Sequence, residues 1–356
     1  MKLMIVTHNM AGGGCERVIA RLLWHFAARG DDCSLVTECA GESFYELPAI
    51  KRHALSDSER MRASDVPRVY RRLRRLVRRE RPDIVLAMPE KVNVWTLLFL
   101  LGTGVPVVVS ERNDPMRHPE RRMKRLLRRL VYPRAAGFVF QTQMAADYFP
   151  PRVRARGIVL DNPLDIDRMP PANTGARQKT VVGAGRLAPQ KNFPLLLRAF
   201  ADFYQGHPGW RLLVYGEGQD RAALEAQAAA LLPAGAWSLP GQTATLYEEL
   251  LTAGMFVLSS DFEGMPNVLI EAMALGAPCV ATDCRVGGPA ALIQHGQNGL
   301  LAPVGDEAAL AGAMSRIAED AALAGAISRQ AAQIRTRLSA ETVCEQWRNY
   351  LVKHMA

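Results

Sequence analysis

One hydrophobic pattern repeats along the chain: short apolar runs alternate with longer amphipathic stretches. The runs Leu3–Thr7, Ile84–Ala87 and Met255–Leu258 are four or five residues long and almost entirely apolar, which is typical of strands buried on both faces of a sheet. The stretches between such runs, for example Cys15–Ala28 and Arg221–Leu232, carry apolar residues at helical spacing. Strands that alternate with helices predict parallel sheets with helices on both faces.

The same reading covers the rest of the chain. Further strands are predicted at Cys33–Thr37, Val105–Ser110, Gly137–Phe140, Gly157–Leu160, Thr180–Ala184, Arg211–Tyr215, Ala236–Leu239 and Cys279–Ala281. Further helices are predicted near Val66–Arg79, Asn93–Leu101, Glu120–Val131, Met144–Phe149, Pro194–Tyr204, Thr245–Leu251, Glu307–Ala318, Ala322–Arg335 and Ala340–Lys353.

The alternation is interrupted once. Asp161–Asp165 ends a first series of strands, and Met169–Gln178 is a segment rich in Pro, Gly and polar residues. The 356 residues also exceed what one typical hydrophobic core holds. We therefore predict an α/β protein of two doubly wound, Rossmann-like domains, residues 1–162 and 163–339. Such domains bind ligands at the carboxyl ends of their strands, so the loops after Thr7, Ala184, Tyr215 and Ser260 are expected to border one cleft.

The stretch 255–276 carries the most informative of these loops. Glu263 lies in the loop that follows the strand, Pro266 stands where the first helical residue is expected, and Glu271 lies in the helix. Carboxylates accept hydrogen bonds from sugar hydroxyls, and the free amides of the turn favour an anion. Together these groups suit a nucleotide-sugar, which offers hydroxyls and phosphates.

Two further loops suit phosphate groups. Gly12–Gly14 follows the first strand and precedes a helix, so that backbone amides can approach a phosphate closely. It matches neither the dinucleotide fingerprint nor the P-loop. Arg186 and Lys191 follow the first strand of the second domain, where a pair of cations can neutralise a leaving diphosphate.

These motifs together resemble the family 4 retaining glycosyltransferases of the GT-B fold. Glu263 and Glu271 match the E-x7-E signature of that family, and Gly12–Glu16, Gly185–Leu187 with Lys191–Asn192, and Gly287–Pro289 match its other motifs in the right order. The resemblance covers essentially the whole chain. It implies two Rossmann-like domains facing across a cleft, and a C-terminal helix, 340–356, that completes the first domain.

The resemblance also implies roles for single residues. The catalytic group is Glu263, which contacts the donor sugar, with Arg186 and Lys191 on the donor diphosphate; no protein nucleophile and no metal are expected. The expected donor-binding residues are Gly13, Gly14, Gly264, Met265, Pro266, Asn267, Glu271 for the ribose, and Gly216 near the nucleobase. Several family members carry a histidine near residue 112 that touches the donor sugar. Here Arg112 or Asn113 stands closest, His118 lies a few residues on, and these three, with His8, are the acceptor-side candidates.

Charge is divided unevenly along the chain. Residues 1–160 hold 29 Lys and Arg against 16 Asp and Glu, a net charge of +13, whereas the remainder carries −4. The basic amphipathic segments Arg71–Arg79 and Arg121–Arg129 are either solvated helix faces or docking surfaces for an anionic membrane. A nucleic-acid-binding protein is a further alternative, although no helix-turn-helix and no interleaved aromatic residues support it.

The remaining features set the compartment and the class. Six scattered cysteines without C-x-x-C spacing indicate neither a zinc site nor a disulfide framework, and therefore a reducing cytosol. Residues 92–109 are too interrupted to span a bilayer, and the N-terminus lacks the features of a signal peptide. We predict a cytoplasmic enzyme, peripheral on the inner face of the membrane, that transfers a sugar from a UDP-linked donor to a polyprenyl-linked glycan; a nucleotide-sugar epimerase of the same fold is the enzymatic alternative.

Overall fold

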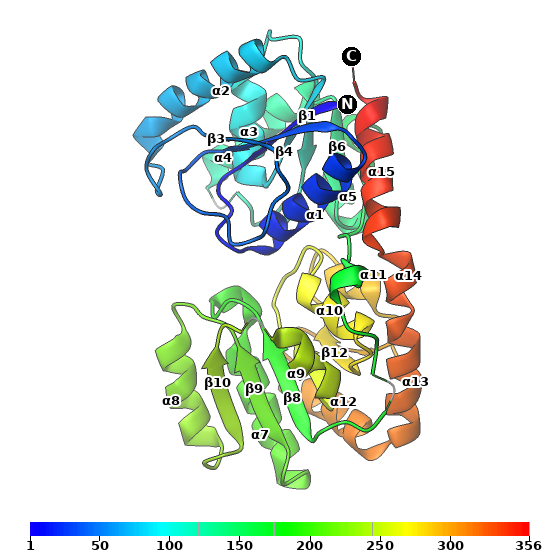
Figure 1. The fold of residues 1–356 in the computed structure, drawn as a ribbon. Helices are drawn as coiled ribbons and strands as arrows, with labels where there is room; N and C mark the ends of the chain where they lie inside the picture. Colours follow the sequence, from blue (N-terminus) through cyan, green and yellow to red (C-terminus); the bar gives the residue numbers. More distant parts are fainter. Residues whose placement is uncertain (120, 174, 244, 356) are drawn as a thin grey trace. The chain divides into compact units, whose positions relative to one another are not determined.

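The chain folds into two compact units. The computed structural model describes residues 1–119, 121–173, 175–243 and 245–355. The first unit comprises Met1–Pro163 with Leu338–Ala356, and the second comprises Leu164–Arg337 (Figure 1). Each unit is a parallel sheet between layers of helices, which confirms the predicted α/β class with two Rossmann-like units.

The first unit is built on a seven-stranded parallel sheet in the order β3-β2-β1-β4-β5-β6-β7. Its strands are β1 (Lys2–Thr7), β2 (Asp32–Thr37), β3 (Lys51–Ala54), β4 (Ile84–Ala87), β5 (Val107–Ser110), β6 (Gly137–Phe140) and β7 (Gly157–Val159). Its helices are α1 (Gly14–Ala28), α2 (Val66–Glu80), α3 (Glu90–Phe99), α4 (Arg122–Val131), α5 (Gln143–Asp147), α6 (Pro151–Arg154) and α15 (Ala340–Lys353), with short 3-10 turns at Ala63–Asp65 and Tyr132–Arg134.

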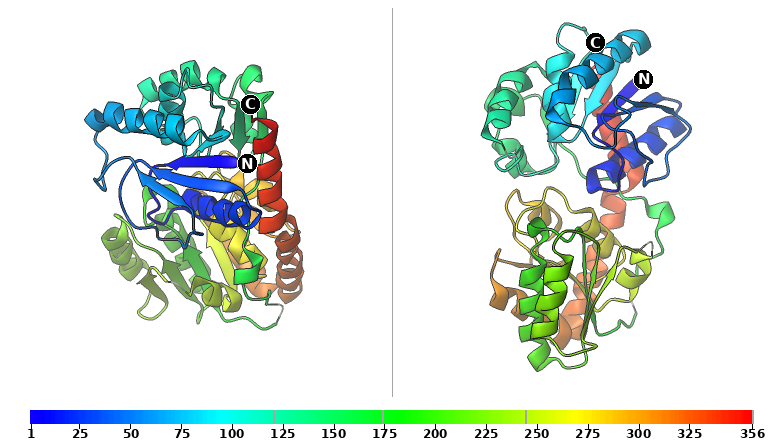
Figure 2. Two further views of the ribbon diagram at one scale, coloured as in Figure 1. Left: turned by 45° about the horizontal axis from the view of Figure 1, so that its top comes forward. Right: turned by 90° about the vertical axis from the view of Figure 1, so that its left-hand side faces the viewer.

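Side chains alternate across this sheet and fill a core on each face. Met4 and Val6 pack with the apolar faces of α2 and α3, while the intervening and fully buried Ile5 points to the opposite face. On that opposite face α15 packs against α1, as Figures 1 and 2 show in red and blue. Trp347 of α15 is fully buried, and Arg348 pairs with Asp31 at 2.8 Å. The C-terminal helix is therefore part of the first unit.

The second unit has a six-stranded parallel sheet in the order β10-β9-β8-β11-β12-β13. Its strands are β8 (Thr180–Ala184), β9 (Arg211–Tyr215), β10 (Trp237–Gly241), β11 (Met255–Leu258), β12 (Cys279–Thr282) and β13 (Leu300–Ala302). Its helices are α7 (Phe193–Gly206), α8 (Arg221–Leu231), α9 (Leu246–Thr252), α10 (Asn267–Ala274), α11 (Gly288–Leu292), α12 (Glu307–Glu319), α13 (Ala321–Ala332) and α14 (Ile334–Arg337), with 3-10 turns at Ile166–Arg168 and Pro189–Lys191. The apolar faces of α7, α8 and α12 form one core with the sheet.

Most predicted elements are present within a few residues of their predicted ends. The sequence pattern missed the edge strand β3, whose four residues are Lys, Arg, His and Ala, and the short elements β13, α6 and α11. It also merged α13 and α14 into one helix. Glu120, the predicted start of the basic helix, lies outside the described residues, as does Ala356 in the predicted segment 340–356. Among the described residues, no helix is long and apolar enough to cross a bilayer.

The strand order fixes where loops meet in each unit. In the first unit the order reverses between β1 and β4, and in the second between β8 and β11. Loops that leave these neighbouring strands at their carboxyl ends diverge to opposite faces and leave a crevice between them, which is the usual ligand site of an open α/β sheet.

Candidate active site

In the second unit, the crevice between β8 and β11 brings together two residues that lie far apart in sequence. Lys191, at the end of the loop after β8, donates a hydrogen bond to Glu263 in the loop after β11, with 2.5 Å between Nζ and Oε1. The Ser260 hydroxyl donates to the same carboxylate oxygen at 2.7 Å. The two side chains of the ion pair are only 16% and 8% exposed. This pair is the centre of the candidate site.

The two loops are tied to each other beside the ion pair. The Asn192 side chain donates to the Asp261 carboxylate at 2.7 Å, and the Gln190 amide donates to the Phe262 carbonyl at 3.0 Å. Asn192 is in the left-handed region and also caps α7. Because the loops are bonded to each other, Lys191 and Glu263 are held at a fixed separation rather than on independent loops.

A third loop, after β9, packs backbone against backbone on the loop after β8. A Cβ at Gly216, which has φ of +138°, would lie 1.9 Å from the Gly185 carbonyl oxygen. A Cβ at Gly218 would lie 2.1 Å from the Leu187 carbonyl oxygen. Only glycine fits at these two positions. The structure thus places Gly216, a predicted donor-binding residue, beside the loop that carries Arg186 and Lys191.

The loop after β11 is also closely packed. Gly264 lies against Gly288, where a Cβ would come within 1.7 Å of the Gly264 carbonyl oxygen. Met265 and Pro266 are buried, and Asn267 is half-buried. Pro266 precedes α10 as its N-cap residue, so its prediction as the first helical residue is wrong by one position. The predicted sugar-binding segment therefore lies against Gly288 of the Gly287–Pro289 motif.

Glu271 lies in the second turn of α10 and is 1% exposed. It accepts a hydrogen bond at 3.3 Å from the hydroxyl of Tyr247, a residue of α9 that sequence reasoning did not select. Arg186 differs: it is exposed, and among the described residues its guanidinium makes no hydrogen bond or ion pair. The structure thus brings Lys191 and Glu263 together and leaves the second predicted cation open to solvent.

Side chains of the first unit pack closely against its glycine turn, Gly12–Gly14. Gly12 has φ of +105°, Gly13 is the N-cap of α1, and Gly14 is the first helical residue. A Cβ at Gly13 would lie 2.3 Å from a carboxylate oxygen of Glu16, and the Tyr45 hydroxyl donates to the Gly13 carbonyl at 3.1 Å. In this structure a carboxylate of the chain itself occupies the space beside the predicted phosphate turn.

The acceptor-side candidates follow β5 in the first unit. Arg112 is 9% exposed and donates to the Asn162 side chain at 2.6 Å, and burial lowers its pKa. His118 lies with its Nδ1 3.9 Å from a carboxylate oxygen of Glu90, the first residue of α3. Burial raises the pKa of Glu90, which is 3% exposed. Asn113 is half-buried. Sequence reasoning did not select Glu90, although its place at the start of the helix that follows β4 could have indicated it.

One predicted surface charge is in fact structural. Arg128, in the predicted basic segment Arg121–Arg129, is 1% exposed and pairs with the buried Glu111 at 3.3 Å. Its guanidinium also donates to the carbonyls of Pro115 and His118 at 2.6 and 2.8 Å. The prediction that this whole segment faces solvent or lipid is therefore wrong at Arg128.

Comparison with known proteins identifies the family of the chain. A model of group 1 glycosyl transferases matches residues 167–334, and a model of glycosyltransferase family 4 matches residues 12–168. An exopolysaccharide phosphotransferase of Streptomyces coelicolor is 39% identical over 170 residues; the match covers 48% of this chain but only 18% of that protein. An N-acetylgalactosamine-N,N'-diacetylbacillosaminyl-diphospho-undecaprenol 4-alpha-N-acetylgalactosaminyltransferase of Campylobacter jejuni is 24% identical, covering 87% of this chain and 88% of its own length.

The fold is also that of a solved structure. Anabaena HepE in complex with UDP superposes with a TM-score of 0.84 at 19% identity, covering 99% of this chain and all of that one. Both sequence models describe glycosyltransferases, and the solved structure has the same two-unit architecture. The chain belongs to the family 4 glycosyltransferases of the GT-B fold.

Proposed function

We propose that the protein is a retaining, metal-independent glycosyltransferase that moves a sugar from a UDP-linked donor to a lipid-linked glycan. The observation that carries this proposal is the Lys191–Glu263 pair in the crevice between β8 and β11. The pair places a cation, which suits the diphosphate of the donor, beside a carboxylate, which suits the hydroxyls of its sugar. Cell-surface polysaccharide assembly is the process that the relatives' names suggest.

Each group has a defined task in this proposal. Lys191 and the exposed Arg186 neutralise the charge that develops on the departing diphosphate, the task that a metal ion performs in other transferases. Glu263 accepts hydrogen bonds from the donor sugar, and Glu271 from the ribose. In keeping with the family mechanism, the departing diphosphate helps to take the acceptor proton, and no covalent protein intermediate forms. Uracil as the base is supported by UDP in the HepE structure.

Donor binding is tested by melting-temperature shifts against a panel of UDP, GDP and ADP sugars. A ligand present at 100 times its dissociation constant stabilises the folded state by about 2.7 kcal/mol. We expect a shift with a UDP sugar, unchanged by a metal chelator. Product analysis separates the alternatives: free UDP and an epimerised sugar without acceptor would indicate an epimerase. Tight duplex binding without any nucleotide-sugar shift would indicate the nucleic-acid-binding protein.

The proposed partner of the first unit is the anionic inner leaflet of the cytoplasmic membrane, and the exposed face of α4 supports this. Met123, Leu126 and Leu130 recur at helical spacing and are 75%, 53% and 60% exposed. Arg122 and Arg129 are exposed on the same helix. Apolar side chains between cations suit a helix that lies in a lipid interface, with its arginines at the head groups.

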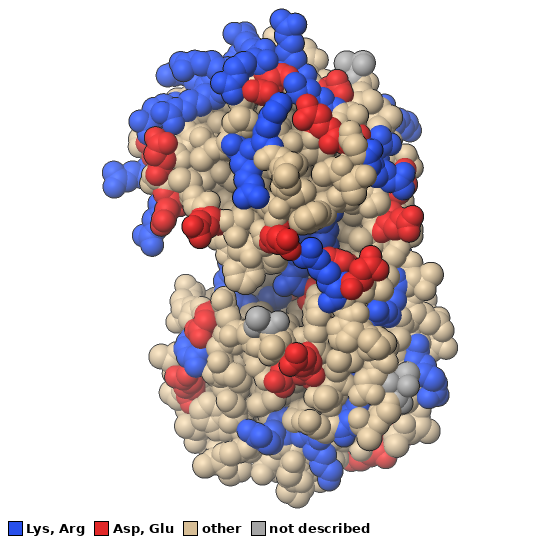
Figure 3. All heavy atoms as spheres, viewed as in Figure 1, with Lys and Arg blue, Asp and Glu red and all other residues tan. Residues whose placement is uncertain are grey.

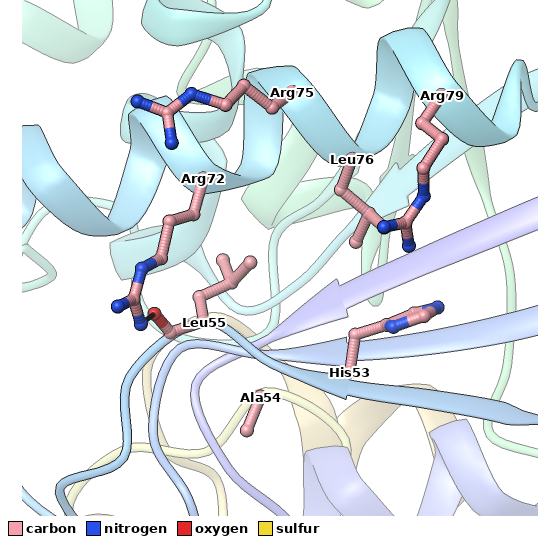
Figure 4. A pocket seen from close by; sticks show the side chains of 7 residues that line it. All are labelled: His53, Ala54, Leu55, Arg72, Arg75, Leu76 and Arg79. Atoms are coloured by element: carbon pink, nitrogen blue, oxygen red, sulfur yellow. Dashed lines mark hydrogen bonds between the residues drawn. The ribbon is translucent and has the colours of Figure 1, made fainter.

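The other basic helix, α2, offers charge alone. Its apolar residues are buried, and Lys and Arg side chains gather over it in Figure 3. A pocket of about 270 Å³ lies between α2 and β3, lined by His53, Ala54, Leu55, Arg72, Arg75, Leu76 and Arg79 (Figure 4). Arg72 and Arg74 are bound to main-chain carbonyls and are structural. We assign α2 to electrostatic attraction and α4 to insertion.

Co-sedimentation with vesicles distinguishes insertion by α4 from electrostatic attraction by α2. Substituting Met123, Leu126 and Leu130 together by Gln should weaken binding to vesicles that contain phosphatidylglycerol, because each buried side chain contributes about 1 kcal/mol or more. Leu231→Gln, in an exposed position of α8, is the control. Binding should also fall at high salt and with neutral vesicles. Unchanged binding in the triple variant would reject insertion, and equal binding to neutral and anionic vesicles would reject the electrostatic part; transfer to a soluble acceptor would then be favoured.

A further inference from the structure

A chain of three hydrogen-bonded side chains lies at the carboxyl edge of the first sheet, outside the groups assigned above. His8 follows β1 directly and Glu38 follows the neighbouring β2. The His8 Nδ1 lies 2.6 Å from the Glu38 Oε2, and the Tyr70 hydroxyl of α2 donates to the other oxygen, Oε1. Glu38 is 2% exposed and Tyr70 is fully buried.

The three residues differ in what they can reach. Burial, and then the Glu38 carboxylate, raise the pKa of Tyr70 well above its ordinary value, so that Tyr70 remains a hydroxyl and a donor. Both oxygens of Glu38 are occupied, one by each neighbour. The His8 side chain is 38% exposed, and among the described residues its Nε2 makes no hydrogen bond. Of these three side chains, the imidazole of His8 is the one that is exposed to solvent.

The partner of Nδ1 determines the chemistry of Nε2. A carboxylate beside Nδ1 holds the proton of a neutral imidazole on that nitrogen, which leaves Nε2 with a lone pair and makes it a hydrogen-bond acceptor. The ring cannot rotate freely, because Glu38 is fixed from behind by Tyr70. An oriented acceptor atom at the ligand edge of the sheet, five residues before Gly13, suits a substrate hydroxyl.

We propose that His8 is an acceptor-binding residue: its Nε2 accepts a hydrogen bond from a hydroxyl of the glycan acceptor other than the one that is glycosylated. Glu38 and Tyr70 are positioning residues that act through His8. The inference rests on the proposed transferase function and adds a residue on the acceptor side of the same reaction. No covalent bond to His8 forms; the histidine binds and orients the acceptor, and the proton of the reacting hydroxyl goes to the departing diphosphate.

The arrangement has a signature in the kinetic constants of transfer. Without an oriented Nε2 the acceptor binds more weakly, so the KM for the acceptor rises while the KM for the donor is unchanged. Glu38→Gln no longer fixes the tautomer of the imidazole, so the acceptor KM rises nearly as much as in a His8 variant. Tyr70→Phe leaves one oxygen of Glu38 without its donor but keeps the His8–Glu38 contact, so the acceptor KM rises less.

The test measures initial rates of UDP release at varied acceptor concentration, with UDP-glucose, or the UDP sugar that the melting screen selects, and farnesyl-diphospho-N-acetylglucosamine as the acceptor probe. We expect His8→Gln to raise the KM for the acceptor about tenfold or more, the effect of one lost hydrogen bond, with the KM for the donor unchanged. A rise in the acceptor KM that is larger in Glu38→Gln than in Tyr70→Phe, with the donor KM unchanged in both, is expected, which a purely structural role would not produce. His207→Gln, which breaks another His–Glu pair of 3.0 Å in the second unit, is the control.

Two results would overturn the inference. The first is a KM for the acceptor that is the same in wild type and in all three variants. The second needs no substrate: ¹⁵N NMR of the wild type at neutral pH should show a bare His8 Nε2, and a proton on Nε2 with Nδ1 bare would reject the orientation. A wild type that releases no UDP from any donor would instead remove the proposed function, and the acceptor role with it, while the NMR result still decides the geometry.

Discussion

Breaking the Lys191–Glu263 pair should cost more stability than breaking an ordinary surface ion pair. Lys191→Met leaves a carboxylate that is only 8% exposed with the Ser260 hydroxyl as its remaining side-chain donor within the described residues. Exposed pairs contribute about 0–1 kcal/mol, and removing one partner of a fully buried pair costs about 3–5 kcal/mol. A nearly buried pair lies between these limits, so we expect a loss of about 2–3 kcal/mol.

A double-mutant cycle measures this coupling directly. Lys191→Met, Glu263→Gln and the double variant are unfolded in urea, and the double variant should be more stable than the sum of the two single losses predicts, by about 1–2 kcal/mol. The control cycle uses Arg198 and Glu307, a pair of similar length at 2.6 Å whose side chains are 43% and 35% exposed. Its coupling should stay below about 1 kcal/mol. A coupling at Lys191 and Glu263 no larger than the control would refute the reasoning that burial strengthens this pair.

Three further tests, with five variants in all, measure the stability of separate parts of the structure. Gly216→Ala should cost about 2 kcal/mol or more, because the new Cβ would lie 1.9 Å from a carbonyl oxygen, whereas Gly312→Ala in α12 has open space and should gain about 0.5–1 kcal/mol. Arg128→Met should cost about 3–5 kcal/mol by leaving the buried Glu111 unpaired, and Arg129→Met on the exposed face should change stability by less than about 0.5 kcal/mol; equal effects would contradict the buried assignment. Burial raises the pKa of Glu90 above its ordinary 4.5, so the folded state holds the carboxyl proton more tightly than the unfolded state. The free energy of unfolding therefore falls as the pH rises from the unfolded-state pKa to the folded-state pKa. Glu90→Gln should remove this part of the pH dependence, and a pH profile of stability that is the same in the variant would contradict the buried assignment of Glu90.

The sequence pattern predicted most of the fold because its strands are buried on both faces and therefore nearly all apolar. β3 was missed for the same physical reason: as an edge strand with the sequence Lys-Arg-His-Ala, it has no continuous apolar run. The loop motifs around Lys191 and Glu263 were predicted to border one cleft because both follow strands at their carboxyl ends and both match motifs of one family; the strand order that makes β8 and β11 neighbours comes from the structure.

Contacts between side chains could not be predicted in this way. The two basic helices have similar sequences, yet α2 buries its apolar stripe while α4 exposes Leu126 and Leu130 and buries Arg128. Which face of a helix packs on the sheet depends on its neighbours, here on the carboxylate of Glu111. The Tyr70–Glu38–His8 chain likewise joins three elements, and no local pattern marks Glu38 as its centre.

The central claim is that the second unit holds a nucleotide-sugar at Lys191 and Glu263 and that its sugar is transferred with retention. The most direct measurement follows a radiolabelled UDP sugar, chosen by the melting screen, into a lipid-extractable product and determines the anomeric configuration of that product by NMR. We predict labelled lipid with the configuration of the donor, and a loss of about 100-fold or more in Lys191→Ala and Glu263→Ala but not in Arg198→Ala. Full turnover in either site variant, or a product of inverted configuration, would contradict the account.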